Sequence, residues 1–331
     1  MTYPEAIVVG FIQGVTELFP VSSLGHNVLI PALIGGSWAS DLNVARPESP
    51  YLAFIVGLHV ATAIGIMIYF WRDWIRIIAG FFTSIIRFQV RTVDQKMAWM
   101  LVVATIPVGV VGLVFEHEFR VLFGKPIRAA IFLLINGIIL YAGERFRTKK
   151  SLAADAEIQQ LRVAQATQAR PRPVPAHAGA HAAASSHVVT RQEEIAHGEQ
   201  ADERLAKKGY LEAVVIGSAQ VLALFAGISR DGVTMVAGMF RGLSREDAAR
   251  FAFLLATPVI LAAGLLKIPD LTGPLGNGIH GQILVGSILS GVGAYVSVRF
   301  LMRYFQTRTL TPFAIYCFLF GLGSIIYLQV K

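Results

Sequence analysis

The chain contains few charged residues and a single cysteine. Lys, Arg, Asp and Glu make up 15% of its 331 residues, whereas a soluble domain carries about 25%, so an ordinary soluble protein is excluded. The lone Cys317 excludes an internal disulfide and lies in an apolar run, where we expect it to pack as a small hydrophobic side chain. The N-terminus lacks a basic segment, and its first apolar stretch contains Glu5, Gln13 and Glu17. We therefore do not expect a cleavable signal peptide.

Apolar residues dominate the composition of the chain. Hydrophobic residues make up 54% of the chain, and the mean hydropathy is +0.59. We predict an all-α, polytopic membrane protein with six spans, several of which need flanking residues to reach the roughly 20 residues of a perpendicular crossing. The predicted spans are Tyr51–Trp71, Trp99–Phe115, Ile127–Tyr141, Ala249–Leu266, Ile283–Val298 and Phe313–Leu328.

Two further segments, residues 5–35 and residues 211–241, are copies of each other. Seven identical residues recur at a fixed offset of 207 positions. The matched pairs are Glu5/Glu212, Ala6/Ala213, Val8/Val215, Gly10/Gly217, Gln13/Gln220, Ser22/Ser229 and Gly25/Gly232. Because the copies are interrupted at Phe19-Pro20 and at Ala226-Gly227, we predict that each forms two short helices joined by a bend. Such re-entrant hairpins can enter the bilayer and return where protein shields their backbone.

The distribution of basic residues predicts the topology. They gather in four regions, residues 72–96, 145–150, 241–250 and 299–308. These regions are expected to be cytoplasmic, which places both termini and the loops at 36–50, 116–126 and 268–280 outside. The same distribution accounts for the net charge of +8 without a nucleic-acid partner.

Three spans in each half make the second half inverted relative to the first. We divide the chain into a first repeat (1–147), a polar cytoplasmic insertion (148–209) and a second repeat (210–331).

The insertion is predicted to be partly disordered around its Pro- and Ala-rich middle, residues 170–186, with flanks able to form helices. We do not expect a metal site there, because the stretch offers no rigid ligand geometry. The histidines in question are His177, His181, His187 and His197.

The first hairpin carries the groups that could perform chemistry. Gln13 and Glu17 are four residues apart and therefore share one helix face. Ser22 or Ser23 suits the N-cap of the next helix, and His26 projects three residues beyond Ser23. An acidic group at bilayer depth is costly and usually functional. A hydroxyl, an imidazole and a carboxylate at a helix N-terminus form a setting that favours phosphate.

The second hairpin supplies an anion-binding group at its bend. Arg230 presents a fixed charge and can bind phosphate with two hydrogen bonds. Ser229 and Thr234 add hydroxyl donors. His59, in the middle of the first predicted span, is equally compatible with a structural and a functional role.

These residues resemble the undecaprenyl-diphosphate phosphatase family of the bacitracin-resistance type. The family carries Glu/Gln-x-x-x-Glu followed by Pro-Val-Ser-Ser-x-Gly-His, which here are Gln13-Gly-Val-Thr-Glu17 and Pro20-Val-Ser-Ser-Leu-Gly-His26. Its second motif, Pro-Gly-x-Ser-Arg-Ser-x-x-Thr, here is Ala226-Gly-Ile-Ser-Arg-Asp-Gly-Val-Thr234. The second motif departs at Ala226 and Asp231. The resemblance covers the chain apart from 148–209.

The resemblance implies a phosphatase that converts a polyprenyl diphosphate to the monophosphate. Such an enzyme recycles the lipid carrier of peptidoglycan synthesis, confers bacitracin resistance and lies in the inner membrane with its site open toward the periplasm. Ser23 is then the expected nucleophile, with His26 as its proton partner or as the nucleophile itself. Glu17 would orient His26 or hold a divalent cation such as Mg²⁺ or Ca²⁺.

The remaining site residues are expected to hold the substrate. Gln13 would assist Glu17, while Arg230, Ser229, Thr234 and Ser22 would bind the diphosphate. A homodimer is also possible. The alternative is a transporter or flippase of a polyprenyl phosphate or small anion, because broken helices in inverted repeats are a transporter trait.

Overall fold

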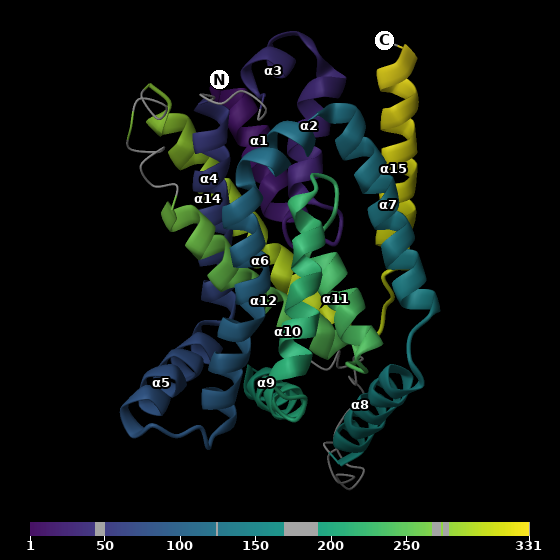
Figure 1. The fold of residues 1–331 in the computed structure, drawn as a ribbon. Coiled ribbons are helices and arrows are strands. Elements are labelled where there is room, and N and C mark those ends of the chain that lie inside the picture. The colour runs from purple at the N-terminus through teal and green to yellow at the C-terminus, as the bar shows by residue number, and fades with distance from the viewer. Residues whose placement is uncertain (44–49, 124, 169–190, 267–272, 274–277, 331) are drawn as a thin grey trace, which may run out of the picture.

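The computed structural model describes residues 1–331 except 44–49, 124, 169–190, 267–272, 274–277 and 331. The described residues are helical and contain no strand (Figure 1). The elements are α1 (Tyr3–Thr16), α2 (Ser23–Ile34), α3 (Gly36–Asp41), α4 (Pro50–Tyr69), α5 (Trp71–Arg87), α6 (Val93–Phe123), α7 (Pro126–Arg145), α8 (Lys149–Gln168), α9 (Arg191–Ala206), α10 (Tyr210–Ser218), the 3₁₀ helix η1 (Ala219–Leu224), α11 (Arg230–Phe240), α12 (Arg245–Leu266), α14 (His280–Tyr304) and α15 (Thr311–Val330).

Five helices among the described residues are long and apolar enough to cross a membrane. They are Val93–Phe115 within α6, and α7, α12, α14 and α15. Each contains one of the predicted spans, so a polytopic all-α membrane protein is confirmed. The remaining predicted span, Tyr51–Trp71, corresponds to α4, which passes the same test only together with α5.

Helix α5 corrects one expectation. The region after the first span was predicted to be a cytoplasmic loop, but Trp71–Arg87 is a helix bent by 93° from α4. Asp73 in its first turn and Arg87 in its last turn complement the helix dipole. A Cβ on Gly80 would lie 2.8 Å from the Asp94 backbone, so this face of α5 lies directly against α6.

Both predicted hairpins are present, and their bends lie where the sequence places them. α1 ends at Thr16 and α2 begins at Ser23, so Phe19-Pro20 falls in the turn. In the second hairpin, Ala226-Gly227 lies between η1 and α11, and η1 is an addition that the apolar pattern did not predict. The starts of α1 and α10, Tyr3 and Tyr210, repeat the 207-residue offset.

The hairpins pack against helices from the opposite half of the chain. A Cβ on Gly10 of α1 would lie 2.5 Å from the Gly286 carbonyl oxygen of α14. A Cβ on the equivalent Gly217 of α10 would lie 2.1 Å from the Ala104 carbonyl oxygen of α6. Small residues allow such close helix approach in membranes. The two halves are therefore interlocked, and each completes the other's packing.

The described part of the polar insertion consists of helices α8 and α9, which lie at the end of the molecule opposite the N-terminus (Figure 1). Asp202 of α9 is buried and bonded to Arg250 at 2.8 Å and to Arg76 at 3.1 Å. Arg204 of α9 bonds Asp247 at 2.8 Å. Ion pairs thus tie α9 to the ends of α5 and α12. The predicted disordered middle, residues 170–186, and the side chains of all four insertion histidines lie outside the described part.

Candidate functional site at the meeting of two helix bends

The bends of the two hairpins contact each other inside the helix bundle. The Gly227 backbone N–H donates to the Ser22 hydroxyl oxygen at 3.2 Å. The buried amide of Asn136, on α7, joins both bends: it donates to the Pro20 carbonyl at 3.0 Å and accepts from the Ser229 N–H at 3.0 Å. These bonds hold the starts of α2 and α11 side by side.

The two helices also begin in the same way. The hydroxyl of Ser22 caps α2 by accepting from the Gly25 N–H at 3.2 Å, and that of Ser229 caps α11 by accepting from the Gly232 N–H at 3.1 Å. A side-chain oxygen at this position satisfies one of the unpaired N–H groups of the first turn. Ser22 adopts a φ of 67°, which is unusual for a residue other than glycine. The first residues of the two helices, Ser23 and Arg230, are consequently equivalent in the repeat.

The carboxylate of Glu17 lies between these two helix starts. It accepts hydrogen bonds from the Ser23 hydroxyl and from the Arg230 guanidinium. The amide of Gln13 donates to it at 2.8 Å, and Nε2 of His59 lies 3.4 Å from it. Glu17 is 7% exposed, and a buried carboxylate needs such partners to stay ionised. The site is therefore one anion surrounded by a hydroxyl, an amide and two basic groups.

His26 occupies a different environment from the one expected. Its Nδ1 lies 2.7 Å from the Ser22 carbonyl oxygen, which can only accept, so Nδ1 carries the hydrogen. Its Nε2 bonds the Tyr316 hydroxyl at 2.7 Å, and its ring stacks on Phe320 with centroids 5.2 Å apart. Both ring nitrogens are engaged away from Ser23, whose hydroxyl is bonded to Glu17 instead. The expectation that His26 shares a proton with Ser23 has no counterpart in this geometry.

The hydroxyls assigned to substrate binding are engaged with the backbone. Ser22 accepts from two N–H groups, and Ser229 accepts from one. Thr234 donates to the Arg230 carbonyl at 2.7 Å, one helical turn back. These bonds shape the two helix starts, whereas Arg230 presents the guanidinium itself, whose Nε has no hydrogen-bond partner.

Several residues of this network were not identified from the sequence. The Asn27 side-chain amide donates to the side-chain oxygen Oε1 of Gln13 at 2.7 Å and thereby orients the amide that faces Glu17. Asn136 and Tyr316 come from spans far along the chain. Asn136 could have been identified as a site residue from the sequence, because it is an isolated amide in an apolar run and polar groups at bilayer depth are uncommon. His59, left open by the sequence, faces Glu17.

Asp231 lies beside Arg230 and is 1% exposed. Neither of its carboxyl oxygens has a hydrogen-bond partner. The buried amide of Gln220, the repeat counterpart of Gln13, is also unpartnered. The second hairpin thus leaves Gln220 unpartnered, whereas its counterpart Gln13 is hydrogen-bonded to Glu17 and Asn27.

A divalent cation such as Mg²⁺ or Ca²⁺ needs several oxygen ligands at one point. No three His, Cys, Asp or Glu side chains within the described ranges gather at one point. Glu17 is the carboxylate at the site, and Mg²⁺ is commonly held by one or two carboxylates together with substrate phosphates. Glu17 with phosphate oxygens is therefore a fitting donor set.

The fold and the site define a polytopic α-helical membrane protein in which two helix starts meet around one buried carboxylate. The sequence matches the bacitracin resistance protein BacA family over residues 6–169 and 177–323. The chain belongs to this family.

Similar proteins support this assignment along the whole chain. An undecaprenyl-diphosphatase of Mycolicibacterium paratuberculosis is 55% identical over 332 residues, covering 100% of this chain and 99% of the relative. Undecaprenyl-diphosphatase 2 of Frankia alni is 52% identical over 97% of this chain and 96% of its own length. Undecaprenyl-diphosphatase 2 of Chromobacterium violaceum is 35% identical over 98% of each chain.

Proposed function

We propose that this protein hydrolyses undecaprenyl diphosphate, or a similar polyprenyl diphosphate, to the monophosphate and inorganic phosphate. The observation that carries the proposal is the contact of Ser23 and Arg230 with one carboxylate, Glu17. The contact supports the proposal because it brings a hydroxyl, the proposed nucleophile, and a guanidinium, the proposed phosphate-binding group, to one point. The names of the full-length relatives support the same activity and a role in recycling the cell-wall lipid carrier. The name of the family supports a role in bacitracin resistance.

We propose the following course for the reaction. Arg230 exchanges Glu17 for the terminal phosphate, because neutralising charge is the main task in phosphoryl transfer. The Ser23 oxygen attacks that phosphorus and passes its proton to Glu17, to which it is already hydrogen-bonded. The bond to the bridging oxygen breaks, and polyprenyl monophosphate leaves. Water then cleaves the phosphoserine and releases phosphate.

A divalent cation, Mg²⁺ or Ca²⁺, belongs to the proposal as an optional component. Glu17 would hold it together with phosphate oxygens of the substrate, and it would add positive charge to the phosphates. Arg230 and His59 remain the basic groups that the chain itself supplies.

We further infer two inverted repeats, residues 1–147 and 210–331, in the inner membrane with the site open toward the periplasm. The repeated helix starts and the packing of each hairpin on the other half support this arrangement. The homodimer stays a prediction. Beyond the broken helices, no feature of the site favours the transporter alternative.

The test is phosphate release from undecaprenyl diphosphate by the purified protein in detergent. Ser23→Ala removes the attacking oxygen, and Arg230→Lys keeps the charge but loses the two-pronged geometry. Each should lower kcat/KM by at least about a hundredfold, while the protein elutes and melts as the wild type does. Wild-type rates in both variants, or no phosphate release by the wild type, would overturn the proposal. Vesicle transport of polyprenyl phosphate that persists in Ser23→Ala would favour the transporter.

A further inference from the structure

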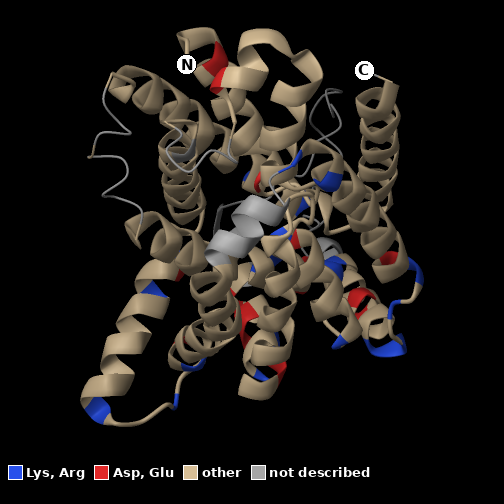
Figure 2. Ribbon diagram, turned by 45° about the horizontal axis from the view of Figure 1, so that its top comes forward, with Lys and Arg blue, Asp and Glu red and all other residues tan. Residues whose placement is uncertain are grey.

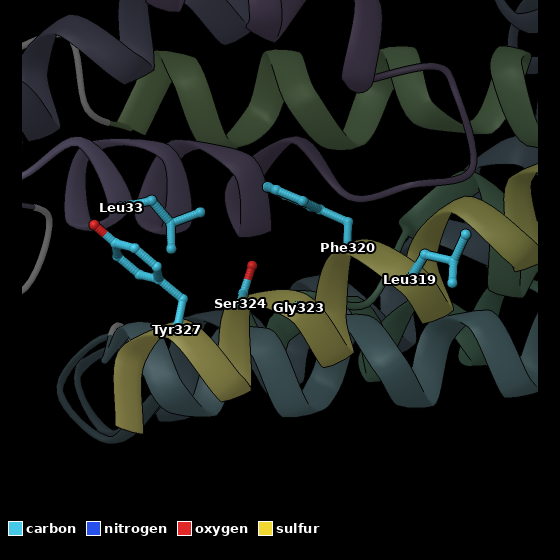
Figure 3. A pocket seen from close by; sticks show the side chains of 6 residues that line it. All are labelled: Leu33, Leu319, Phe320, Gly323, Ser324 and Tyr327. Carbon is cyan, nitrogen blue, oxygen red and sulfur yellow. The ribbon is translucent and has the colours of Figure 1, made fainter. Parts of the chain in front are cut away.

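An apolar groove runs between α2 and α15. It encloses about 330 Å³ and is lined by Leu33 of α2 and by Leu319, Phe320, Gly323, Ser324 and Tyr327 of α15. Figure 3 shows Leu33 facing Tyr327 and Ser324 across the groove, with Phe320 further along it. The two helices therefore border a groove whose lining is mostly apolar, with the hydroxyl groups of Ser324 and Tyr327 as its polar members.

The groove lies next to His26, on the helix that carries Ser23. Phe320, which lines it, stacks on His26, and His26 lies on α2 one turn after Ser23. Leu33 is ten residues after Ser23, a distance of about 15 Å along an α-helix. When the phosphate of a substrate lies at Ser23, the groove therefore lies farther along the same helix.

The small residues of α15 keep the groove open. A Cβ on Gly323 would meet no atom within 4 Å, whereas a Cβ on Gly321 would lie 2.8 Å from the Leu134 backbone nitrogen of α7. The two glycines thus have different roles, because Gly321 allows helix packing and Gly323 borders empty space. Ser324, a short side chain, is the groove's other small member.

We propose that this groove receives the first isoprene units of the substrate's lipid tail. The proposal rests on the proposed function, because the occupant is the polyprenyl chain attached to the diphosphate at Ser23. Lipid is as apolar as the groove, so a tail gains no hydrophobic transfer energy by entering it. The groove acts by position: it fixes the tail so that the diphosphate lies against Ser23 and Arg230.

The experiment fills the groove without touching the site. Gly323→Leu places a side chain in open space, and Gly109→Leu on α6 is a matched control, since its Cβ also meets nothing within 4 Å. Both variants are assayed with undecaprenyl diphosphate and with isopentenyl diphosphate, whose single isoprene unit does not extend along the groove. Gly323→Leu should lower kcat/KM for the long substrate at least about tenfold while hydrolysis of the short one stays within about twofold. Gly109→Leu should leave both unchanged.

The outcomes separate the two proposals. Equal rates of Gly323→Leu and wild type on undecaprenyl diphosphate would overturn the groove assignment, whereas a wild type that hydrolyses neither substrate would overturn the proposed function. A photoreactive polyprenyl diphosphate with its label in the first isoprene units gives a second measurement on the wild type. Labelling should map to residues 23–34 and 311–330. Labelling confined to other helices would assign the groove to another occupant, such as a phospholipid chain.

Discussion

At the scale of single residues, we propose that Ser23 passes its proton to Glu17 and not to His26, because its hydroxyl is hydrogen-bonded to Glu17. Glu17→Gln keeps the size of the side chain but removes the proton acceptor, so we expect activity to fall by about 10²- to 10⁴-fold. His26→Asn loses a stacked ring and the bond to Tyr316, and its activity should fall less. Phosphate release under saturating substrate measures both variants. A larger loss in His26→Asn than in Glu17→Gln would return the proton-accepting role to His26.

Asp231 permits a prediction about stability at the same scale. Both of its oxygens are buried without a partner, and an unsatisfied buried polar group costs about 1–3 kcal/mol. Asp231→Ser should therefore raise the free energy of unfolding by about that amount, because it removes the unpartnered buried carboxyl group and leaves a smaller, neutral hydroxyl. Phosphate release should be unchanged. Thermal unfolding in detergent is the measurement, and a lower midpoint together with lost activity would reveal a role for the carboxyl group.

Part of the site could be predicted from local sequence. The spacing of Gln13 and Glu17 places both on one helix face, and the bend at Pro20 predicts the cap at Ser22. The orientation of His26 could not be predicted, because it depends on Tyr316, which is 290 residues away. His59 presented the same difficulty, since its contact with Glu17 exists only after α4 packs beside α1.

At the scale of elements, the predicted spans and hairpins followed from long apolar runs broken at proline or glycine. α5 escaped prediction because arginines interrupt its apolar positions, and a search for continuous runs does not detect a helix with one polar face. Its exposed apolar residues are Trp71, Ile75, Ile78, Phe82, Ile85 and Ile86. They recur at helical spacing and form a stripe along one side of the helix.

This stripe, together with the 93° bend after α4, predicts that α5 lies in the plane of the membrane surface. Spin labels at Phe82→Cys and Thr83→Cys, each introduced in a Cys317→Ser background, test this in vesicles. The label at 82 should collide mainly with oxygen dissolved in lipid, and the label at 83 mainly with a water-soluble nickel chelate. Because the two positions are adjacent, each controls for local mobility. Equal exposure of both labels to the nickel chelate would place α5 in water.

At the scale of the whole molecule, charge is distributed unevenly along the bundle. Figure 2 shows most Lys, Arg, Asp and Glu residues at the end that carries α5, α8 and α9, and few near the N-terminus. The acidic residues at this end pair with arginines, as Asp202 does with Arg250. The structure thus places α8 and α9, the described part of the insertion, against the bundle. Composition alone did not predict this, because ion pairs between distant segments leave no periodic pattern.

This distribution predicts the orientation of the molecule. Basic residues remain on the cytoplasmic side of a membrane, so α9 should face the cytoplasm and α3, at the opposite end, the periplasm (Figure 1). In a Cys317→Ser background, Ser40→Cys on α3 and Glu203→Cys on α9 each place one exposed thiol at one end. A membrane-impermeant maleimide applied to intact spheroplasts should label position 40 and should label position 203 only after lysis. Labelling of position 203 in intact spheroplasts would reverse the orientation and would place the open end of the site toward the cytoplasm.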